Sequence, residues 1–181
     1  DLKWSIQGLL NLCENGPKDG GLVIVPDTHK IHHEFFMNLG KGDLKGDWYK
    51  FSEEEKKDPV FRNAIKVCGK AGDLMLWDSR TFHCNTVPAT ENTRACVYIC
   101  QIPKEMVMDN VKVNRYDAWV NKRCSSHHPG DGFRMFPTVP KGADENIEKI
   151  IPTISMTDND LTELQKSLLC VIESHKPRPK K

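Results

Sequence analysis

His83 and Arg94 are the two residues of this sequence whose types and spacing are best suited to chemistry at one site. Arg94 follows His83 at a distance of 11 positions. This spacing predicts that the two side chains lie at facing ends of two neighbouring antiparallel strands. An imidazole there could hold a metal ion, and a planar guanidinium could bind a carboxylate through two parallel hydrogen bonds. The pair therefore favours a site that brings a metal and a carboxylate together.

Segments with the composition of β-strands surround this pair and would position it. Five such segments are expected, at residues 4–12, 22–25, 64–68, 74–77 and 94–102. Turn signals rich in Gly, Pro, Asn and Asp separate them, above all at 13–21. The first half of the chain is therefore expected to be an antiparallel β structure.

Helical patterns are scattered in the first half of the chain and prevail in the second. A short helix is expected within 29–39, and Ser52 is expected to cap a short surface helix whose first turn is acidic. Residues 104–123 have loosely helical spacing. A clearer helix begins at Thr157, where Asp160 follows in the manner of a capping box and an apolar stripe continues beyond it.

Strands followed by helices predict a mainly β fold with added α structure. We expect a single domain in which residues 1–102 form the β part and residues 103–181 a helical C-terminal extension packed on it, with a basic tail at 176–181. A two-sheet jelly roll uses about eight strands, so five would make an incomplete one. Any remaining strands are then expected upstream of Asp1 or from another source.

The composition narrows the class of protein. Lys and Arg number 26 and Asp and Glu 25, which gives no reason to expect a nucleic acid or an anionic membrane surface as a partner. No apolar run approaches the roughly 20 residues that a membrane span needs. The seven cysteines form no CxxC pair, and their odd number argues against a disulfide framework, so a reducing, cytoplasmic location is expected. Because the chain begins at Asp1 without an initiator Met, we expect it to start partway through a longer protein.

Several segments together have a familiar pattern. They are Trp4 to Gly8, the turn from Asn15 to Gly21, the strand and turn from Leu22 to Lys30, the Gly72-Asp73 turn and the His83 to Arg94 pair. This pattern resembles phytanoyl-CoA dioxygenase-like proteins, closely over residues 1–102 and weakly over 103–181. The resemblance implies an Fe(II)- and 2-oxoglutarate-dependent oxygenase that hydroxylates a small-molecule substrate, built on a double-stranded β-helix of the jelly-roll or cupin-like kind.

The resemblance also implies roles for four residues. His83 would be the distal iron ligand, Arg94 would bind the far carboxylate of 2-oxoglutarate, and Asn85 and Gln7 would contact the co-substrate or line its pocket. The family's other two iron ligands form a His-x-Asp pair, expected about ten residues before Trp4 and thus upstream of this chain. The chain alone is then expected to bind Fe(II) weakly and to be inactive, because a facial triad needs all of its ligands. No catalytic residue is assigned.

Plainer interpretations remain open for each of these residues. His83 could be a hydrogen-bonded histidine at a strand end, Arg94 a surface arginine, Asn85 a turn residue and Gln7 a polar residue on a sheet face. In function, the alternative is a non-catalytic jelly-roll relative that serves as a binding or assembly module. The exposed sheet edges of an incomplete barrel would favour association in either case.

Other residues invite chemistry less strongly. His32 and Glu34 have a His-x-Glu spacing, but residues two apart on a helix do not face one another. A surface metal site formed by His29, His32 and His33, or one at His127-His128, is the less favoured interpretation. Four aromatic residues are expected mainly to pack in a core: Trp48, Tyr49, Phe51 and Phe61.

Overall fold

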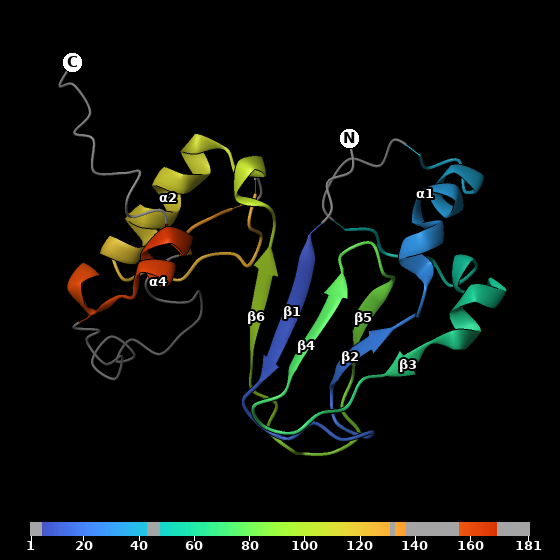
Figure 1. Cartoon of the computed structure of the whole chain (residues 1–181). Coiled ribbons are helices and arrows are strands. Elements are labelled where there is room, and N and C mark those ends of the chain that lie inside the picture. The colour runs from blue at the N-terminus through green and yellow to red at the C-terminus, as the bar shows by residue number, and fades with distance from the viewer. Residues whose placement is uncertain (1–4, 43–47, 131–132, 137–155, 170–181) are drawn as a thin grey trace. The chain divides into compact units, whose positions relative to one another are not determined.

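The computed structural model describes residues 5–42, 48–130, 133–136 and 156–169. The chain divides into two compact units, residues 1–101 and 102–181. The first unit holds the β structure and the second holds helices and a short extended loop (Figure 1). None of the helices in the described part of the chain is long and apolar enough to cross a membrane.

The first unit contains two antiparallel sheets of three strands each. Their strands are β1 (Ile6–Asn11), β2 (Gly21–Ile24), β3 (Ile65–Lys66), β4 (Leu74–Asp78), β5 (His83–Thr86) and β6 (Cys96–Gln101). One sheet has the order β4-β1-β6 and the other the order β3-β2-β5. The expected antiparallel β structure is confirmed, since every predicted strand segment overlaps an observed strand.

Strand β5 was not expected, and its position corrects one prediction. Its sequence, His83-Cys84-Asn85-Thr86, lacks the alternation of apolar and polar residues that indicates a strand. Three of its four residues are exposed. β5 pairs with β2, whereas β6, which begins just after Arg94, pairs with β1. The prediction that His83 and Arg94 lie on two neighbouring strands is therefore wrong: β5 and β6 belong to different sheets, and Arg94 lies in the loop before β6.

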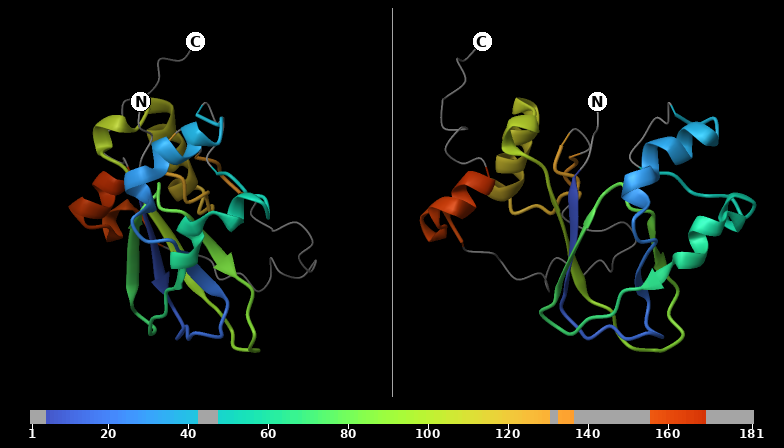
Figure 2. Two further views of the ribbon diagram at one scale, coloured as in Figure 1. Left: turned by 90° about the vertical axis from the view of Figure 1, so that its right-hand side faces the viewer. Right: turned by 45° about the vertical axis from the view of Figure 1, so that its right-hand side comes forward.

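Loops join the two sheets at one end of the first unit, and helix α1 (Thr28–Asn38) stands at the other end (Figure 2). The backbone of Ala89 donates to Lys18 O at 2.8 Å, and that of Leu12 donates to Ala95 O at 2.9 Å. An isolated bridge pairs Asn15 with Gly69. These bonds connect the loops at residues 12–20, 67–73 and 87–95, which join the strands at this end of the unit.

An aromatic core lies beneath α1. Val25, Phe36 and Phe82 are its buried centre. Partly buried side chains surround them: Phe35, Leu39, Tyr49, Phe51, Val60 and Phe61. The expectation of core packing is confirmed for three of the four predicted aromatic residues, whereas Trp48 is 81% exposed.

Thr28 attaches the start of α1 to the ends of two strands. Its side chain is 1% exposed. Its hydroxyl donates to Val25 O at 2.7 Å and accepts the Phe82 N–H at 2.8 Å. One hydroxyl therefore satisfies two buried backbone groups that come from segments far apart in the sequence.

Replacing Thr28 with Val is expected to lower the free energy of unfolding by about 1–3 kcal/mol, the usual cost of leaving a buried donor without a partner. Valine keeps the side-chain shape but cannot accept the Phe82 N–H. Urea unfolding of the two proteins measures the difference, with Thr28→Ser as the control that retains the hydroxyl. Equal stability of the Val and Ser variants would contradict this assignment.

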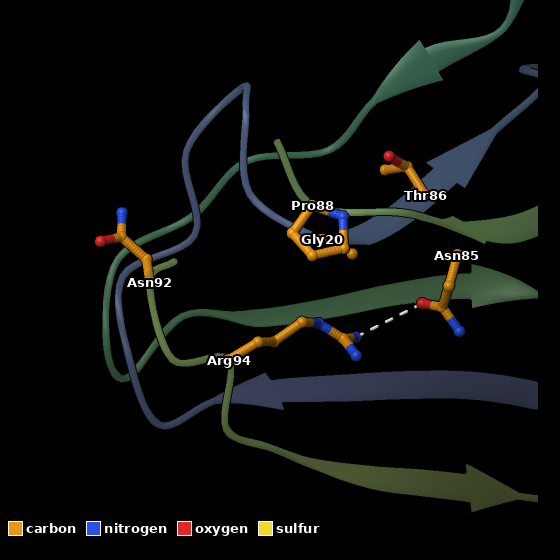
Figure 3. A pocket seen from close by; sticks show the side chains of 7 residues that line it. Gly20, Asn85, Thr86, Pro88, Asn92 and Arg94 are labelled. Carbon is orange, nitrogen blue, oxygen red and sulfur yellow. Dashed lines mark hydrogen bonds between the residues drawn. The ribbon is translucent and has the colours of Figure 1, made fainter. Parts of the chain in front are cut away.

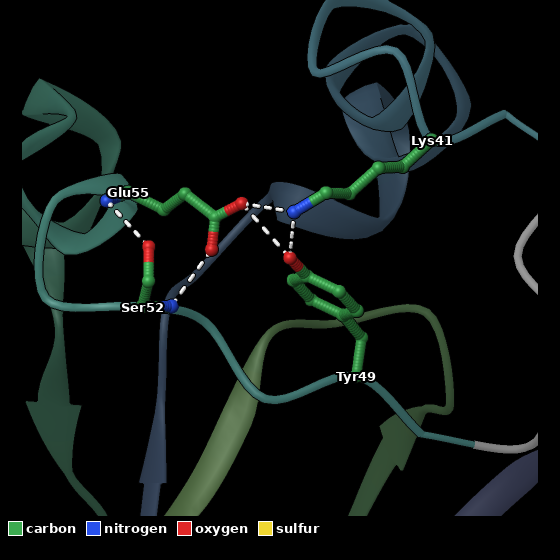
Figure 4. A network of polar contacts seen from close by, with 4 residues as sticks. All are labelled: Lys41, Tyr49, Ser52 and Glu55. Atoms are coloured by element: carbon green, nitrogen blue, oxygen red, sulfur yellow. Dashed lines mark hydrogen bonds and ion pairs between the residues drawn. The ribbon is translucent and has the colours of Figure 1, made fainter.

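A polar cluster borders the same core and contains Lys41, Tyr49, Ser52 and Glu55 (Figure 4). Lys41 pairs with Glu55 and donates to the Tyr49 hydroxyl. Glu55 also accepts the Ser52 N–H at 2.7 Å, while the Glu55 N–H donates to Ser52 Oγ at 3.2 Å. This reciprocal pair has the hydrogen-bond pattern of a capping box, but the 3-10 helix that follows, η1 (Glu55–Lys57), has Glu54 and not Ser52 at its N-cap. A second 3-10 helix, η2 (Pro59–Asn63), follows.

Glu55→Gln is expected to lower the thermal unfolding midpoint at neutral pH. The hydrogen bond from Lys41 is the main cause that lowers the pKa of Glu55 from 4.5 to about 2. A depressed folded-state pKa means that the carboxylate's contribution is complete above pH 4.5 and is lost as the pH falls toward 2. The difference in midpoint between wild type and variant should therefore shrink across that window.

Calorimetric scans as a function of pH test this expectation. Glu54→Gln is the matched control, because Glu54 forms an exposed pair with Lys57. Exposed pairs of this kind contribute little to stability. A Glu55→Gln midpoint that equals the wild-type value at neutral pH would show that the cluster does not stabilise the fold.

The described residues of the second unit include four helical segments. They are η3 (Lys104–Met106), α2 (Asp109–Val120), η4 (Asp158–Asp160) and α4 (Glu163–Leu168). The predicted capping box of Thr157 and Asp160 is present, but a second box at Thr162 and Gln165 divides the expected helix into η4 and α4. Asp158 joins α2 to η4 by accepting from Tyr116 OH at 3.0 Å and Trp119 Nε1 at 2.6 Å.

Candidate active site

His83 is the first residue of β5 and lies opposite Ile24 of β2. Its Nδ1 is 2.7 Å from Thr81 O. A carbonyl oxygen can only accept, so Nδ1 carries the ring proton and Nε2 holds the free lone pair. This is the tautomer in which a histidine binds a metal through Nε2.

Trp77 connects His83 to the other sheet. The rings of Trp77 and His83 have centroids 5.5 Å apart and planes inclined by 60°. Trp77 Nε1 donates to Gln7 Oε1 at 2.8 Å, and the two residues are opposite one another in the β1–β4 register. Gln7 and Trp77 therefore form a hydrogen-bonded pair, and the Trp77 ring of this pair packs against the imidazole of His83.

Arg94 and Asn85 meet beside a hollow in the first unit (Figure 3). Arg94 Nη2 is 3.4 Å from Asn85 Oδ1 and 3.3 Å from Tyr98 OH. Arg94 Nε is buried, and no hydrogen-bond partner for it is found in the described part of the chain. The guanidinium thus has two long contacts and one donor with no acceptor.

The hollow has a volume of about 270 Å³. It is lined by Gly20, Gly21, Asn85, Thr86, Pro88, Asn92 and Arg94. Two of these are glycines at the start of β2, so backbone rather than side chains forms part of its wall. Gly21 has φ +155°, and a Cβ there would lie 2.7 Å from Asn15 Oδ1. Any larger residue at this position would disturb the wall of the hollow.

The structure therefore places one pair of the four predicted site residues in direct contact and a third on the same strand. Asn85 contacts Arg94, and Asn85 and His83 share one face of β5, about 7 Å apart along the strand. Gln7 does not line the hollow; it reaches His83 only through Trp77. Asn85, which contacts Arg94, stands two positions beyond His83 on the same strand.

The comparison with known families bears on what this arrangement does. The sequence model of phytanoyl-CoA dioxygenase (PhyH) matches residues 4–96, which include all four predicted site residues. The chain belongs to the phytanoyl-CoA dioxygenase family. The expected family resemblance is thus confirmed.

Two curated relatives of this phytanoyl-CoA dioxygenase family member show how far the similarity extends. Ava biosynthesis cluster protein O of Aspergillus versicolor is 32% identical over 133 residues, which are 68% of this chain and 41% of that protein. A Dictyostelium discoideum protein named provisionally as a phytanoyl-CoA dioxygenase is 26% identical over 132 residues, 73% of this chain and 36% of that protein. The chain therefore spans less than half the length of these relatives.

The described residues of this family member do not form a complete metal site. No group of three His, Cys, Asp or Glu side chains that could hold a metal is found among them. The His32 ring packs against Phe36 and Phe82, with centroids 4.9 and 6.1 Å away, and burial lowers the pKa of this histidine. His32 therefore packs against aromatic rings, and the less favoured metal site at His29, His32 and His33 finds no support among the described residues.

Two residues of the site were missed from the sequence, Trp77 and Tyr98. Trp77 supports His83, and Tyr98 OH contacts both Asn85 and Arg94. The alternation of side chains between the two faces of each strand could have indicated both residues. Tyr98 stands two strand positions beyond Cys96 and Trp77 two beyond Met75, on the face that also carries Gln7. The contact between Gln7 and Trp77 could not be predicted, because the register of β1 against β4 is not specified by the local sequence.

Proposed function

We propose that this protein is an Fe(II)- and 2-oxoglutarate-dependent dioxygenase that hydroxylates a small molecule. The observation that carries the proposal is the buried Arg94 Nε, which has no partner among the described residues, at a hollow that is also lined by Asn85 and Thr86 of the strand that begins with His83. Bound Fe(II) would supply the oxidation of a substrate C–H bond by O2, coupled to conversion of 2-oxoglutarate into succinate and CO2. The residues of this chain hold and orient the participants.

Arg94 is proposed to bind the distal carboxylate of 2-oxoglutarate. A carboxylate presents two acceptor oxygens to the planar fork of a guanidinium, which would give Nε the acceptor it lacks. Asn85, 3.4 Å from Arg94 Nη2, can donate its amide to the same carboxylate or hold the guanidinium in place. The donor chemistry of the hollow therefore fits an anionic small molecule.

His83 is proposed as one iron ligand through Nε2. The Thr81 carbonyl fixes the tautomer, and Trp77 with its partner Gln7 fixes the plane of the ring. Gln7 thus acts on the metal ligand through Trp77 rather than on the co-substrate. The two further ligands of a facial triad are expected outside the described residues, and weak Fe(II) binding is expected for residues 1–181 alone.

The two antiparallel sheets are proposed to be part of a double-stranded β-helix. Their strand orders, β4-β1-β6 and β3-β2-β5, place His83 in one sheet and its support, Trp77 and Gln7, in the other. A site that lies between two sheets draws its residues from both sheets in this way. The family's fold supports the proposal, and this chain would supply six of the strands.

Two measurements on the full-length protein test the proposed function. Calorimetric titration with 2-oxoglutarate in the presence of Fe(II) and absence of O2 should give saturable binding. Admission of air should then produce succinate in an amount that depends on Fe(II). Binding without succinate would favour the alternative of a non-catalytic binding module, and absence of binding would refute the 2-oxoglutarate site altogether.

A further inference from the structure

Asp19 occupies an unusual position between the two loops that border the hollow. The turn at residues 15–20 leads into Gly20 and Gly21, and the loop at 87–95 carries Pro88, Asn92 and Arg94. Asp19 itself does not line the hollow, and its residue is only 8% exposed. A nearly buried carboxylate needs hydrogen-bond donors around it. The identity of these donors shows what the residue does.

The donors to Asp19 come from both loops. Its Oδ1 accepts from the Thr90 hydroxyl and, at 3.1 Å, from Asn92 Nδ2. Its Oδ2 accepts the Gly16 N–H at 2.7 Å. These bonds, led by the one from Thr90, lower the pKa of Asp19, so the residue is a carboxylate at neutral pH. The Asp19 side chain therefore connects the loop that carries Arg94 to the turn at residues 15–20, whose last residue, Gly20, also lines the hollow.

The bonds of Asp19 hold one side of the segment that carries Arg94. Among the described residues, the Arg94 guanidinium contacts Asn85 Oδ1 at 3.4 Å and Tyr98 OH at 3.3 Å, and it lies 5.9 Å from the centroid of the Tyr98 ring. Arg94 itself stands two residues beyond Asn92 and two before β6 begins, beside Ala95, whose carbonyl accepts the Leu12 N–H. The position of the Arg94 Cα is therefore fixed by β6 on one side and by the Asp19 bonds on the other. Only one residue separates Asn92 from Arg94, so a displacement of Asn92 is expected to move Arg94 as well.

We infer that Asp19 is a positioning residue that fixes the loop of Arg94 over the hollow and thereby sets the affinity for the carboxylate of the co-substrate. This inference rests on the proposed function for the identity of the ligand. It makes the Asp19–Thr90 pair part of the co-substrate site although neither side chain lines the hollow. The effect is on binding, because neither residue is placed at the metal ligand.

Kinetics of 2-oxoglutarate turnover by the full-length protein test the inference. Asp19→Asn and Thr90→Val should each raise the KM for 2-oxoglutarate by about 10-fold, as expected for loss of a hydrogen bond to a charged group, with kcat within about 2-fold of wild type. Thr90→Ser keeps the hydroxyl and should restore the wild-type KM. A KM unchanged in both Asp19→Asn and Thr90→Val would overturn the inference.

A matched control separates positioning from support of a turn. Asp73 accepts the Lys70 N–H at 2.7 Å, in the same three-residue relation as Asp19 and Gly16, and no bond from it to the loop at 87–95 is found among the described residues. Asp73→Asn should leave the KM for 2-oxoglutarate unchanged. A rise equal to that of Asp19→Asn would mean that loss of any such turn has the same effect, and would refute the specific role.

A second measurement keeps the inference testable if the proposed function fails. Absence of 2-oxoglutarate turnover in the wild-type protein would count against the proposed function alone. Nuclear magnetic resonance of ¹⁵N-arginine-labelled protein then reports the position of Arg94 directly. Thr90→Val should shift the Arg94 Nε–H signal and Asp73→Asn should not; an unshifted signal in Thr90→Val would overturn the positioning role whatever the ligand.

Discussion

Replacing Arg94 with alanine in the full-length protein is expected to raise the KM for 2-oxoglutarate at least about 100-fold, since loss of one partner from a buried, hydrogen-bonded charge pair has an effect of this size or larger. The variant removes every guanidinium donor from the hollow, including the buried Nε that has no acceptor among the described residues. Arg94→Lys retains the charge but not the planar fork, so its KM is expected to lie between those of the other two proteins.

Initial rates of succinate formation at varied 2-oxoglutarate concentration give this KM. Arg62→Ala is the control, because Arg62 is an exposed residue of η2 and does not line the hollow. The KM of this control should equal that of wild type. An Arg94→Ala protein with a wild-type KM would place the carboxylate elsewhere and would return Arg94 to the interpretation of a structural arginine.

Replacing His83 with alanine is expected to reduce turnover to about 1% of wild type or less, because even loss of a partner behind a metal ligand costs up to about 100-fold. The variant removes the imidazole whose Nε2 is free of the Thr81 contact. Added Fe(II) should not restore the rate, since the missing group is the ligand and not the metal. Succinate formation over a range of Fe(II) concentrations makes the measurement.

His33→Ala is the matched control for this prediction. His33 is exposed on α1, so its loss should leave turnover unchanged. The binding of 2-oxoglutarate to His83→Ala in the absence of added metal should also persist, because Arg94 is intact. Full turnover in His83→Ala would exclude this residue as a metal ligand.

Much of the β structure could be predicted from local sequence, and β5 shows where that approach ends. The apolar runs Leu22-Val23-Ile24 of β2 and Leu74-Met75-Leu76-Trp77 of β4 mark their strands through composition. The residues of β5 have no such pattern, because their strand is defined by hydrogen bonds to β2 and most of their side chains are exposed. A strand with polar side chains on both faces cannot be recognised by periodicity.

Four residues of the candidate site were named from the sequence, whereas Trp77, Tyr98 and the contacts among these side chains were not. Spacing alone pointed to His83 and Arg94, and the family resemblance added Asn85 and Gln7. The structure confirms that Asn85 contacts Arg94, while their roles toward iron and 2-oxoglutarate remain predictions. Strand pairing brings Gln7 and Trp77 together across 70 positions of sequence, and no local pattern encodes such a long-range contact.

The most direct test of the central claim is to observe Arg94 while 2-oxoglutarate is added. In the full-length protein labelled with ¹⁵N-arginine, the Arg94 Nε–H signal can be assigned by its absence from Arg94→Lys. Our account predicts that 2-oxoglutarate shifts this signal and slows its exchange with water, because Nε gains the acceptor that it lacks among the described residues. A signal that stays unchanged at a 2-oxoglutarate concentration that saturates binding would contradict the account.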